Sequence, residues 1–361
     1  MITPRELGFA MPAEWAAHAG CWMIWPERSD NWRLGAKPAQ AAFAAVAGAI
    51  ARFEPVTMMA SARQFAQARA VLPEAVRVVE VSTNDAWARD VGASFLVNAQ
   101  GELGGVDWPF NAWGGLENGL YFPWDLDDQV AVKMLQMERA QRFRAPKIVE
   151  GGAVHVDGEG SILVTEACLL SEDRNPGATR QEMERVLKDY LGGSHVIWLG
   201  AGVPRDETGG HVDNLACFVR PGVVLLTWCD DPNDPHYAVS RDAEARLQGA
   251  VDAQGRRITV ERIPMPTPMF ITGEEAAGID QAVNGMNRAA GERLAASYVN
   301  FYIANGAIIA PEFGVPTDAP ARDVLQNLFP ERVIVPVPAR EILLGGGNIH
   351  CITQQQPRVL G

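Results

Sequence analysis

Four short stretches of the sequence carry side chains that can do chemistry. They read NDAWARD at 84–90, EGG at 150–152, GGHVDN at 209–214 and GGGNIHC at 345–351. Asp90 lies 60 positions before Glu150, and Glu150 lies 61 positions before His211. Cys351 follows His211 by 140 positions, which is twice 70. Reactive residue types at such regular spacing indicate repeated units whose loops converge on one site.

Cys351 is the candidate nucleophile. It follows a Gly-Gly-Gly-Asn loop, whose backbone N–H groups are expected to form an anion-stabilising concavity beside the thiol. A lone cysteine is more often a small buried hydrophobe. The remaining four fit that description because they lie in or beside apolar runs: Cys21, Cys168, Cys217 and Cys229.

His211 and Asp213 stand two positions apart, so on a strand their side chains would point to the same side. A buried core histidine is the alternative interpretation of His211, and a salt bridge to Arg89 is the alternative for Asp90. We interpret His155 and His350 as structural, because nothing near them in the sequence supplies a partner type.

No other catalytic chemistry explains the whole set. The sequence contains no phosphate-binding GxxxxGK[ST], no GxGxxG after a strand, no HExxH and no GxSxG motif. Glu150, His211 and Asp213 could form a carboxylate–histidine metal site of the iron or manganese type. That interpretation leaves Cys351 and its glycine loop unexplained, so the sequence favours a site without a metal.

A thiol, a histidine and three carboxylates are an unusual combination, because carboxylates raise the pKa of a thiol. The conflict disappears if the substrate brings the positive charge. A guanidinium group is planar and permanently charged, and it pairs bidentately with carboxylates. Cys351 would attack its central carbon, ammonia would leave with a proton from His211, and water would hydrolyse the thiouronium.

Helical spacing of apolar residues predicts helices over Lys37–Phe53, Ala62–Leu72, Asp127–Arg142, Thr179–Leu191, Ser240–Ala253 and Ala321–Leu328. Short apolar runs that predict strands follow them: VTMMA, KIV, HVIWLG, RITVERI and RVIVPV. Paired runs with a central Asp-Gly, Pro-Gly or Asn-Gly predict hairpins at 153–166, 214–228 and 298–313. Five units of about 72 residues would account for this pattern.

Composition limits the class of protein. The chain has 361 residues and 47% hydrophobic content, enough for one large core. A single domain over 1–361 is predicted, with two unrelated α+β domains as the alternative. The formal charge of −13 disfavours nucleic acid as a partner and suits a small cationic ligand. The five cysteines form no disulfide framework, and no secretory signal or membrane-length apolar run occurs, so a cytoplasmic location without membrane contact is expected.

At these residues the sequence resembles the agmatine deiminase family, within the peptidyl-arginine deiminase group of guanidino-modifying enzymes. The resemblance runs nearly end to end. The segments that carry it are MPAEWAAHAGCWMIWPER, NDAWARD, WPFNAWGG, EGGAVHVDG, GGHVDN, RPGVVLLTW, SYVNFY, APEFG and LLGGGNIHCITQQQP. It implies an α/β fold of five ββαβ modules, arranged as a propeller with pseudo-fivefold repeats around a central active site.

Carried over by motif, the family's nucleophile falls on Cys351 and its general acid and base on His211. The guanidinium-holding acids fall on Asp90, Glu150 and Asp213. Trp87 matches a tryptophan near the substrate, with core packing as the alternative. The sequence departs from the family pattern at Ala93, where relatives often have proline, and at Gly210, where a polar residue is expected.

The resemblance implies hydrolysis of agmatine to N-carbamoylputrescine and ammonia through a covalent Cys-amidino intermediate, as in putrescine and polyamine biosynthesis. It implies no metal and no organic cofactor. A deiminase of free or peptide-linked arginine is the first alternative, and Arg89 and Arg205 are the candidate carboxylate contacts for it. A guanidinium-binding protein without catalysis is the second. The sequence leaves open whether the chain is a homodimer or a higher homo-oligomer.

Overall fold

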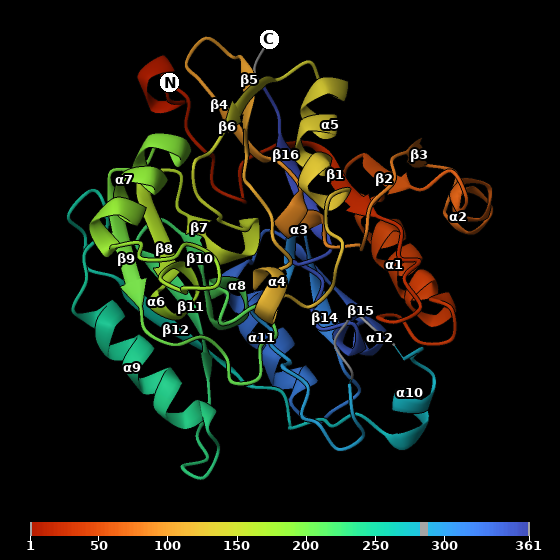
Figure 1. The fold of residues 1–361 in the computed structure, drawn as a ribbon. Coiled ribbons are helices and arrows are strands. Elements are labelled where there is room, and N and C mark those ends of the chain that lie inside the picture. The colour runs from red at the N-terminus through yellow and green to blue at the C-terminus, as the bar shows by residue number, and fades with distance from the viewer. Residues whose placement is uncertain (1, 282–287, 360–361) are drawn as a thin grey trace.

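The computed structural model describes residues 2–281 and 288–359, and it contains five small β-sheets. Figure 1 shows the chain passing around the molecule, with α1 (Lys37–Ile50), α7 (Arg180–Leu191) and α9 (His236–Gln248) at its periphery. The first and last segments come together, because β1 (His18–Ile24) pairs with β16 (Thr353–Pro357). The expected α/β class with five small sheets is confirmed.

Four of the sheets repeat one arrangement. Each begins with an antiparallel hairpin, and a helix then leads to a third strand that runs parallel to the second. Their strands are β4 (Ser94–Val97), β5 (Leu103–Asp107) and β6 (Gln141–Arg144); β7 (His155–Val156), β8 (Ser161–Thr165) and β9 (His195–Leu199); β10 (Ala216–Arg220), β11 (Val223–Trp228) and β12 (Thr259–Pro264); and β13 (Tyr302–Ala304), β14 (Ala307–Glu312) and β15 (Val333–Pro338).

The remaining sheet joins the two ends of the chain. Its strand order is β16-β1-β2-β3, with β2 at Val56–Ala60 and β3 at Val76–Glu80. β16 runs antiparallel to β1, and β1 runs parallel to β2. The C-terminal strand therefore takes the place of the first hairpin strand, and Cys351 lies directly before it.

Local sequence explains why these elements form. The three predicted hairpins are confirmed, and Gly222 and Gly306 adopt the positive φ of 73° and 82° that their tight turns require. Helix α7 begins after Thr179, whose side chain caps the N–H of Glu182, and ends at Gly192 with φ 74°. Its buried face packs against the β7–β8–β9 sheet. The residues of this face are Met183, Val186, Leu187, Tyr190 and Leu191.

Several predicted bounds were wrong. The helix predicted over 127–142 consists of a 3₁₀ turn (Asp127–Gln129) and α5 (Val130–Met137). Arg139 then takes φ 53°, which breaks the helix and lets 141–144 pair with β5 as strand β6. The run KIV at 147–149 is consequently not a strand, because β6 already occupies that edge of the sheet.

Three further helices differ from their predicted bounds. Helix α9 begins at His236, four residues before the predicted start, and α2 covers Phe65–Val71. Helix α11 covers Asp318–Leu328. The β4–β5 hairpin and β3 were not predicted, since their sequences carry no Asn-Gly or Asp-Gly turn signal.

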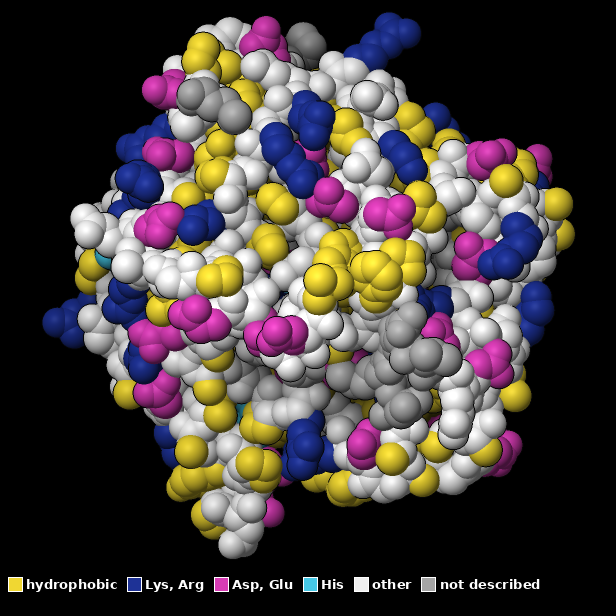
Figure 2. All heavy atoms as spheres, in the orientation of Figure 1, with side chains coloured by type: hydrophobic (Ala, Val, Ile, Leu, Met, Phe, Trp, Pro, Cys, Tyr) yellow, Lys and Arg dark blue, Asp and Glu magenta, His cyan; other side chains and the backbone are white. Residues whose placement is uncertain are grey.

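The central strands are buried, and the visible surface carries charges of both signs. Strands β8, β10, β11 and β14 are almost wholly buried. On the face shown in Figure 2, acidic and basic side chains are interspersed rather than gathered by sign. Within residues 2–281 and 288–359, no helix is both long and apolar enough to cross a membrane.

Candidate active site

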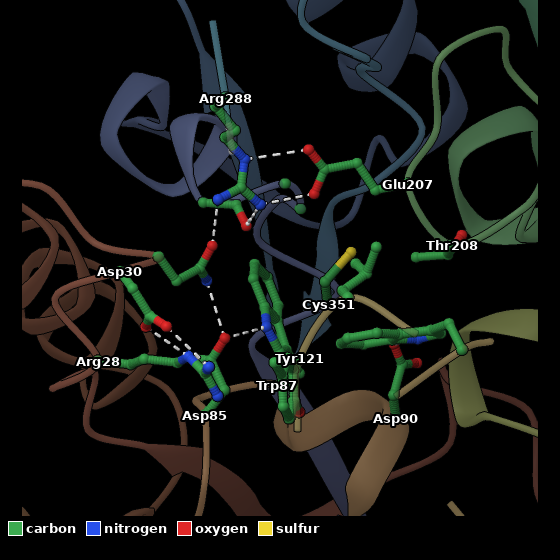
Figure 3. Close-up of a pocket in the computed structure, with 16 residues that line it drawn as sticks. Arg28, Asp30, Asp85, Trp87, Asp90, Tyr121, Glu207, Thr208, Arg288 and Cys351 are labelled. Atoms are coloured by element: carbon green, nitrogen blue, oxygen red, sulfur yellow. Dashed lines mark hydrogen bonds and ion pairs between the residues drawn. The ribbon is translucent and has the colours of Figure 1, made fainter. Parts of the chain in front are cut away.

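A pocket opens beside Cys351, with a space of about 460 Å³ that includes its mouth. Figure 3 shows Cys351 with Trp87 and Asp90 flanking it. The residues that line the pocket are Arg28, Asp30, Asn31, Asp85, Trp87, Asp90, Trp113, Leu120, Tyr121, Glu207, Thr208, Arg288, Gly345, Gly346, Gly347 and Cys351. Sequence reasoning had identified Trp87, Asp90, Cys351 and the glycine loop 345–347 among these.

Each predicted side chain stands just before the first strand of a sheet. Asp90 lies in the one-turn helix α3 (Ala88–Val91) before β4, and Glu150 precedes the 3₁₀ turn η3 (Gly151–Ala153) before β7. His211 is the N-cap of the one-turn helix α8 (Val212–Leu215) before β10. Cys351 lies in the turn before β16. Equivalent places in successive modules therefore bring these residues together, as their spacing predicted.

The strand expected for His211-Val-Asp213 was wrong, because these residues begin the short helix α8. The two side chains nevertheless reach one place. A Cβ built on Gly152 would lie 2.6 Å from His211 Nδ1, 2.9 Å from Asp213 Oδ2 and 2.9 Å from Asp90 Oδ1. Glycine at 152 leaves the space in which these three polar atoms converge.

Asp90 borders the pocket and is held from two sides. Its Oδ2 accepts the indole N–H of Trp113 at 3.0 Å, and its Oδ1 accepts the N–H of Gly152 at 3.0 Å. Burial, with the nearby charges of Asp213 and Glu150, outweighs the attraction of His211 and raises the pKa of this carboxyl to about 6. The salt bridge between Asp90 and Arg89 was a wrong alternative: Arg89 lies against Glu14 and Gln355.

Glu150 is fixed by an arginine that the sequence did not single out. Arg174, in the segment between α6 (Glu166–Leu169) and α7, donates its Nε–H to both carboxylate oxygens at 2.9 and 3.0 Å. It also donates to the carbonyl of Thr208 at the pocket wall. Burial raises the pKa of Glu150, but the charges of Arg174 and His211 outweigh it and lower that pKa to about 2.

His211 is completely buried between carboxylates. Its Nε2 lies 3.3 Å from Glu150 Oε2, and its Nδ1 lies 3.8 Å from Asp90 Oδ1. Burial lowers its pKa, yet Asp90, Cys168 and Glu150 together raise it well above the usual value. These neighbours therefore favour the protonated form of the imidazole.

Cys168 belongs to this environment, although its sequence context indicated only a buried hydrophobe. The ligand-type atoms of Glu150, Cys168 and His211 lie within 4.8 Å of one another. The metal alternative had named Asp213 as the third ligand, but Asp213 Oδ2 lies against His350 and Cys351 instead. Both oxygens of Glu150 face the guanidinium of Arg174, so a fixed cation already occupies the place a metal ion would need.

Cys351 is buried, with its Sγ 3.4 Å from Asn300 Oδ1 and 3.8 Å from Asp213 Oδ2. Burial and the charges of Asp213 and Asp90 raise the pKa of the thiol well above its usual value. Asn300, directly before the β13–β14 hairpin, also accepts the backbone N–H groups of His350 and Cys351. Asn300 is the site residue that comes from the β13–β14–β15 sheet. The motif SYVNFY was the signal that could have identified it.

The glycine loop serves the sulfur through one backbone group only. The N–H groups of Gly345 and Gly346 donate to Ile342 and Leu343 in α12 (Arg340–Leu344), whereas the backbone N–H of Asn348 hydrogen-bonds to the Cys351 sulfur and acts to lower its pKa. Glycine at 347 is needed because a Cβ there would overlap the ring of Trp87 and lie 3.1 Å from the Cβ of Cys351. The loop thus permits close approach of the indole to the thiol.

Trp87 lines the pocket, as the sequence predicted, and also packs in the core. Its indole N–H donates to Asp85 Oδ2 at 2.9 Å, and its ring lies 5.2 Å from that of Trp32. The other oxygen of Asp85 accepts the indole N–H of Trp32 at 2.7 Å. Asp85 thereby fixes both rings, and only the tertiary structure revealed this role.

His350 has the partners that the sequence appeared to lack. Its Nδ1 lies 2.9 Å from Asp213 Oδ2, and its Nε2 lies 2.8 Å from Glu14 Oε1. His155 stacks on it with ring centroids 6.4 Å apart and lies 3.6 Å from Glu14 Oε2. Both histidines were interpreted as structural because no partner type lies near them in the sequence, but the fold brings Glu14 to them from far away.

Two polar atoms in the site are buried without a hydrogen-bond partner among the described residues: Asp213 Oδ1 and His211 Nδ1. Unsatisfied buried polar atoms are costly, so native proteins keep them mainly where a ligand completes them. A planar cation with several N–H donors beside Cys351 fits the free acceptor Asp213 Oδ1 and the carboxylate of Asp90.

The chain matches a known protein family and several related proteins over nearly its whole length. The model of the Porphyromonas-type peptidyl-arginine deiminase family matches residues 10–357. The agmatine deiminase of Pseudomonas aeruginosa (strain LESB58) is 57% identical over 357 residues, covering 98% of this chain and 97% of that protein. That of Ectopseudomonas mendocina is 56% identical over 361 residues, covering 99% of this chain and 98% of that protein.

Solved structures give the same result. The Enterococcus faecalis agmatine deiminase, described as catalysing its reaction, superposes with a TM-score of 0.97 at 46% identity, covering 100% of this chain and 99% of that chain. A substrate-bound cysteine-to-serine variant of the C. jejuni agmatine deiminase superposes with a TM-score of 0.83 at 26% identity, covering 98% and 97%.

Proposed function

This chain belongs to the Porphyromonas-type peptidyl-arginine deiminase family, and we infer that it hydrolyses a guanidino carbon–nitrogen bond of agmatine, giving N-carbamoylputrescine and ammonia. Such a reaction serves the synthesis of putrescine and the polyamines. The observation that carries the inference is the convergence of Asp90, His211 and Asp213 on the space left by Gly152, next to the Cys351 thiol.

In this proposal the carboxylates hold the guanidinium. Asp90 and the free Oδ1 of Asp213 accept N–H groups of the substrate, while Glu150, which Arg174 keeps ionised, holds His211 in place. Charge-assisted hydrogen bonds to a planar guanidinium fix both its position and its orientation. Trp87 lies beside the thiol and supplies an apolar wall for the aliphatic part of the substrate.

The bound guanidinium lowers the pKa of the Cys351 thiol, which releases its proton to water. The thiolate Sγ forms a bond to the central guanidino carbon, and His211 gives its proton to the departing nitrogen, which leaves as ammonia and takes up the released proton in solution. The product of this step is an amidino group on the sulfur. His211, now neutral, removes a proton from water, and the resulting hydroxide attacks the same carbon. The carbon–sulfur bond breaks, and the urea product leaves the restored cysteine.

The charges lining the pocket favour agmatine over arginine. Four carboxylates, those of Asp30, Asp85, Asp90 and Glu207, face only two guanidinium groups, those of Arg28 and Arg288. Arg28 is already paired with Asp30, and Arg288 with Glu207. Figure 3 shows both pairs. A dication such as agmatine suits this excess of negative charge, whereas the carboxylate of arginine lacks an uncommitted cation there.

We extend the proposal to the architecture. The five sheets form a closed propeller of five ββαβ modules and one domain over 1–361, with β16 completing the first module. The repeated strand order of the other four sheets supports this arrangement, as does the placement of one site segment before the first strand of each sheet.

The test is ammonia release from agmatine compared with free arginine and an N-acyl arginine amide. We expect the specificity constant kcat/KM for agmatine to exceed that for either arginine compound by at least about 100-fold, because a buried unpaired charge costs several kcal/mol. Higher activity on arginine would transfer the function to an arginine deiminase.

The Cys351→Ala variant is the control for catalysis. It should bind agmatine yet release no ammonia, and a haloamidine should label Cys351 alone among the five cysteines of the wild-type protein. Agmatine binding without turnover in the wild-type protein would leave a guanidinium-binding protein.

A further inference from the structure

A buried polar chain runs from Asp213 away from the pocket. Asp213 Oδ2 lies 2.9 Å from His350 Nδ1, and His350 Nε2 lies 2.8 Å from Glu14 Oε1. All three side chains are at most 4% exposed. Glu14 precedes β1 and lies 336 positions from His350 in the sequence, so this contact exists only because the two ends of the chain meet.

The partners of His350 fix its protonation. Both ring nitrogens face carboxylate oxygens, which accept hydrogen bonds, so both nitrogens must donate and the ring is an imidazolium. Burial and Arg89 lower the pKa of His350, but Glu14 and Asp213 outweigh them and raise it. The neighbouring elements present three more groups: Arg89 on α3 and His155 on β7 face Glu14, and Cys217 on β10 lines the same small cavity.

This arrangement divides the two oxygens of Asp213 between two tasks. Oδ2 accepts the His350 N–H and lies 3.8 Å from the Cys351 thiol. Oδ1 is buried and has no partner among the described residues. If His350 released Oδ2, the carboxylate could rotate and satisfy itself elsewhere. Oδ2 also faces the space left by Gly152, where Asp90 Oδ1 and His211 Nδ1 converge. The histidine therefore fixes the orientation of the whole carboxylate and leaves Oδ1 free to accept a further hydrogen bond.

We propose that His350 and Glu14 are positioning residues of the reaction: the Glu14–His350 pair clamps Asp213 Oδ2 and so fixes the orientation in which the Asp213 carboxylate meets the guanidinium. This inference rests on the proposed function for its substrate. The Glu14–His350 pair has a second effect, on the pKa of the Cys351 thiol. The positive imidazolium of His350 offsets part of the negative charge that Asp213 places beside that thiol.

Two variants of His350 and one of Glu14 test whether these residues hold Asp213 in position or only fill space in the core. In His350→Asn the amide nitrogen can take the place of Nδ1 and still donate to Asp213, whereas in His350→Gln it reaches toward Glu14 and leaves Asp213 unheld. We expect kcat/KM for agmatine to fall about 10- to 100-fold in the Gln variant and clearly less in the Asn variant, with a rise in KM in the Gln variant.

Glu14→Gln preserves the shape and removes only a charge. Because the Glu14 charge raises the pKa of His350, its loss should move the alkaline fall of kcat/KM to lower pH. A second readout needs no turnover: alkylation of Cys351 by iodoacetamide in the free protein. Both His350 variants should alkylate more slowly at a given pH, since Asp213 then acts on the thiol without its counter-charge, and Glu14→Gln should do so only at a pH where His350 has lost its proton.

The His18–Glu54 pair provides the matched control. It is another buried histidine–glutamate pair, at 3.1 Å, and it does not touch Asp213. His18→Gln should lower stability while leaving the pH dependence of kcat/KM and the alkylation rate unchanged. Equal kinetics in His350→Asn and His350→Gln, with the wild-type alkylation profile in both, would overturn the inference. If the wild-type protein released no ammonia from agmatine, the proposed function would fail, and alkylation would still test the clamp.

Discussion

At the scale of residues, the site keeps its acid and its nucleophile apart. Cys351 contacts Asp213 and Asn300, while His211 is held by Glu150 and Asp90. Asp213 and Asp90 raise the pKa of the thiol, and Asp90 and Glu150 raise that of the imidazole, so both shifts favour a neutral thiol and a charged histidine in the free protein. This favours a substrate that supplies the positive charge needed to form the thiolate.

We therefore expect thiolate formation to depend on ligand binding. Ultraviolet thiolate absorbance should be absent from the free protein at neutral pH and should appear when a non-reactive agmatine analogue is added. By linkage, each unit by which the analogue lowers the thiol pKa corresponds to about 1.4 kcal/mol of binding energy. Cys351→Ser supplies the baseline. A thiolate present at about pH 6 without ligand would instead indicate a resting Cys351–His211 ion pair.

Asp90 should control binding at acid pH. Burial raises its pKa to about 6, and only the ionised carboxylate can hold a guanidinium. Calorimetric titration of Cys351→Ser with agmatine should give a constant Kd above about pH 7 and a Kd that rises about tenfold per pH unit below about pH 6. Adding Asp90→Asn should weaken binding and remove this slope. An unchanged slope in the double variant would assign the titration to another group.

At the scale of elements, each sheet presents a short segment before its first strand, and these segments hold the chemistry. One-turn helices carry Asp90 and Asp213, a 3₁₀ turn follows Glu150, and Asn300 and Cys351 precede β13 and β16. Such short segments have too few internal hydrogen bonds to fix themselves. They are held by contacts between neighbouring modules, as when Asn300 accepts the N–H of His350.

The segment between α6 and α7 supplies the most important of these supports, Arg174. Arg174→Gln leaves the Glu150 carboxylate buried without its counter-ion, so we expect a loss of about 3–5 kcal/mol in unfolding free energy at neutral pH. The low pKa of Glu150, about 2, means that its stabilising contribution is present above about pH 4.5 and is lost as the pH falls toward 2.

Urea unfolding of the variants measures this effect. Adding Glu150→Gln to Arg174→Gln should recover much of the lost stability, because the unpaired charge is removed, but it should not restore activity. Arg180→Gln is a suitable control, since Arg180 pairs with Glu166 at the exposed surface and should cost less than about 1 kcal/mol. Wild-type stability of Arg174→Gln would contradict the argument.

At the scale of the whole molecule, the pairing of β1 with β16 joins the chain ends next to the nucleophile. His18 is in register with Pro357 and Cys21 with Gln355. The exposed surface is 13931 Å², close to the roughly 14,000 Å² expected for one compact protein of this length. Both features support the proposal that the five modules close into a single domain.

A circular permutant tests this closure. We expect a chain whose natural ends are joined by a Gly/Ser linker, and which opens at the exposed turn between Gln254 and Gly255, to retain kcat within about threefold. A chain truncated before Thr353 should lose both solubility and activity, because β1 then lacks its partner and Cys351 its support. An active truncated chain would show that closure is dispensable.

The sequence by itself determined much of this protein. Apolar periodicity and Gly-containing turns predicted the α/β class and three hairpins, and the spacing of Asp90, Glu150, His211 and Cys351 predicted that they meet. These features were readable because they depend on local backbone preference or on the repeat length. The motifs then identified the family.

Only the tertiary structure decided which side chains support the site. Arg174, Asn300 and Glu14 each act on a residue far away in the sequence, and Asp85 joins Trp87 to the distant Trp32. The partners of His350 were missed for the same reason. Burial turns a polar contact into a strong determinant of charge and position, and burial is a property of the assembled modules rather than of any one segment.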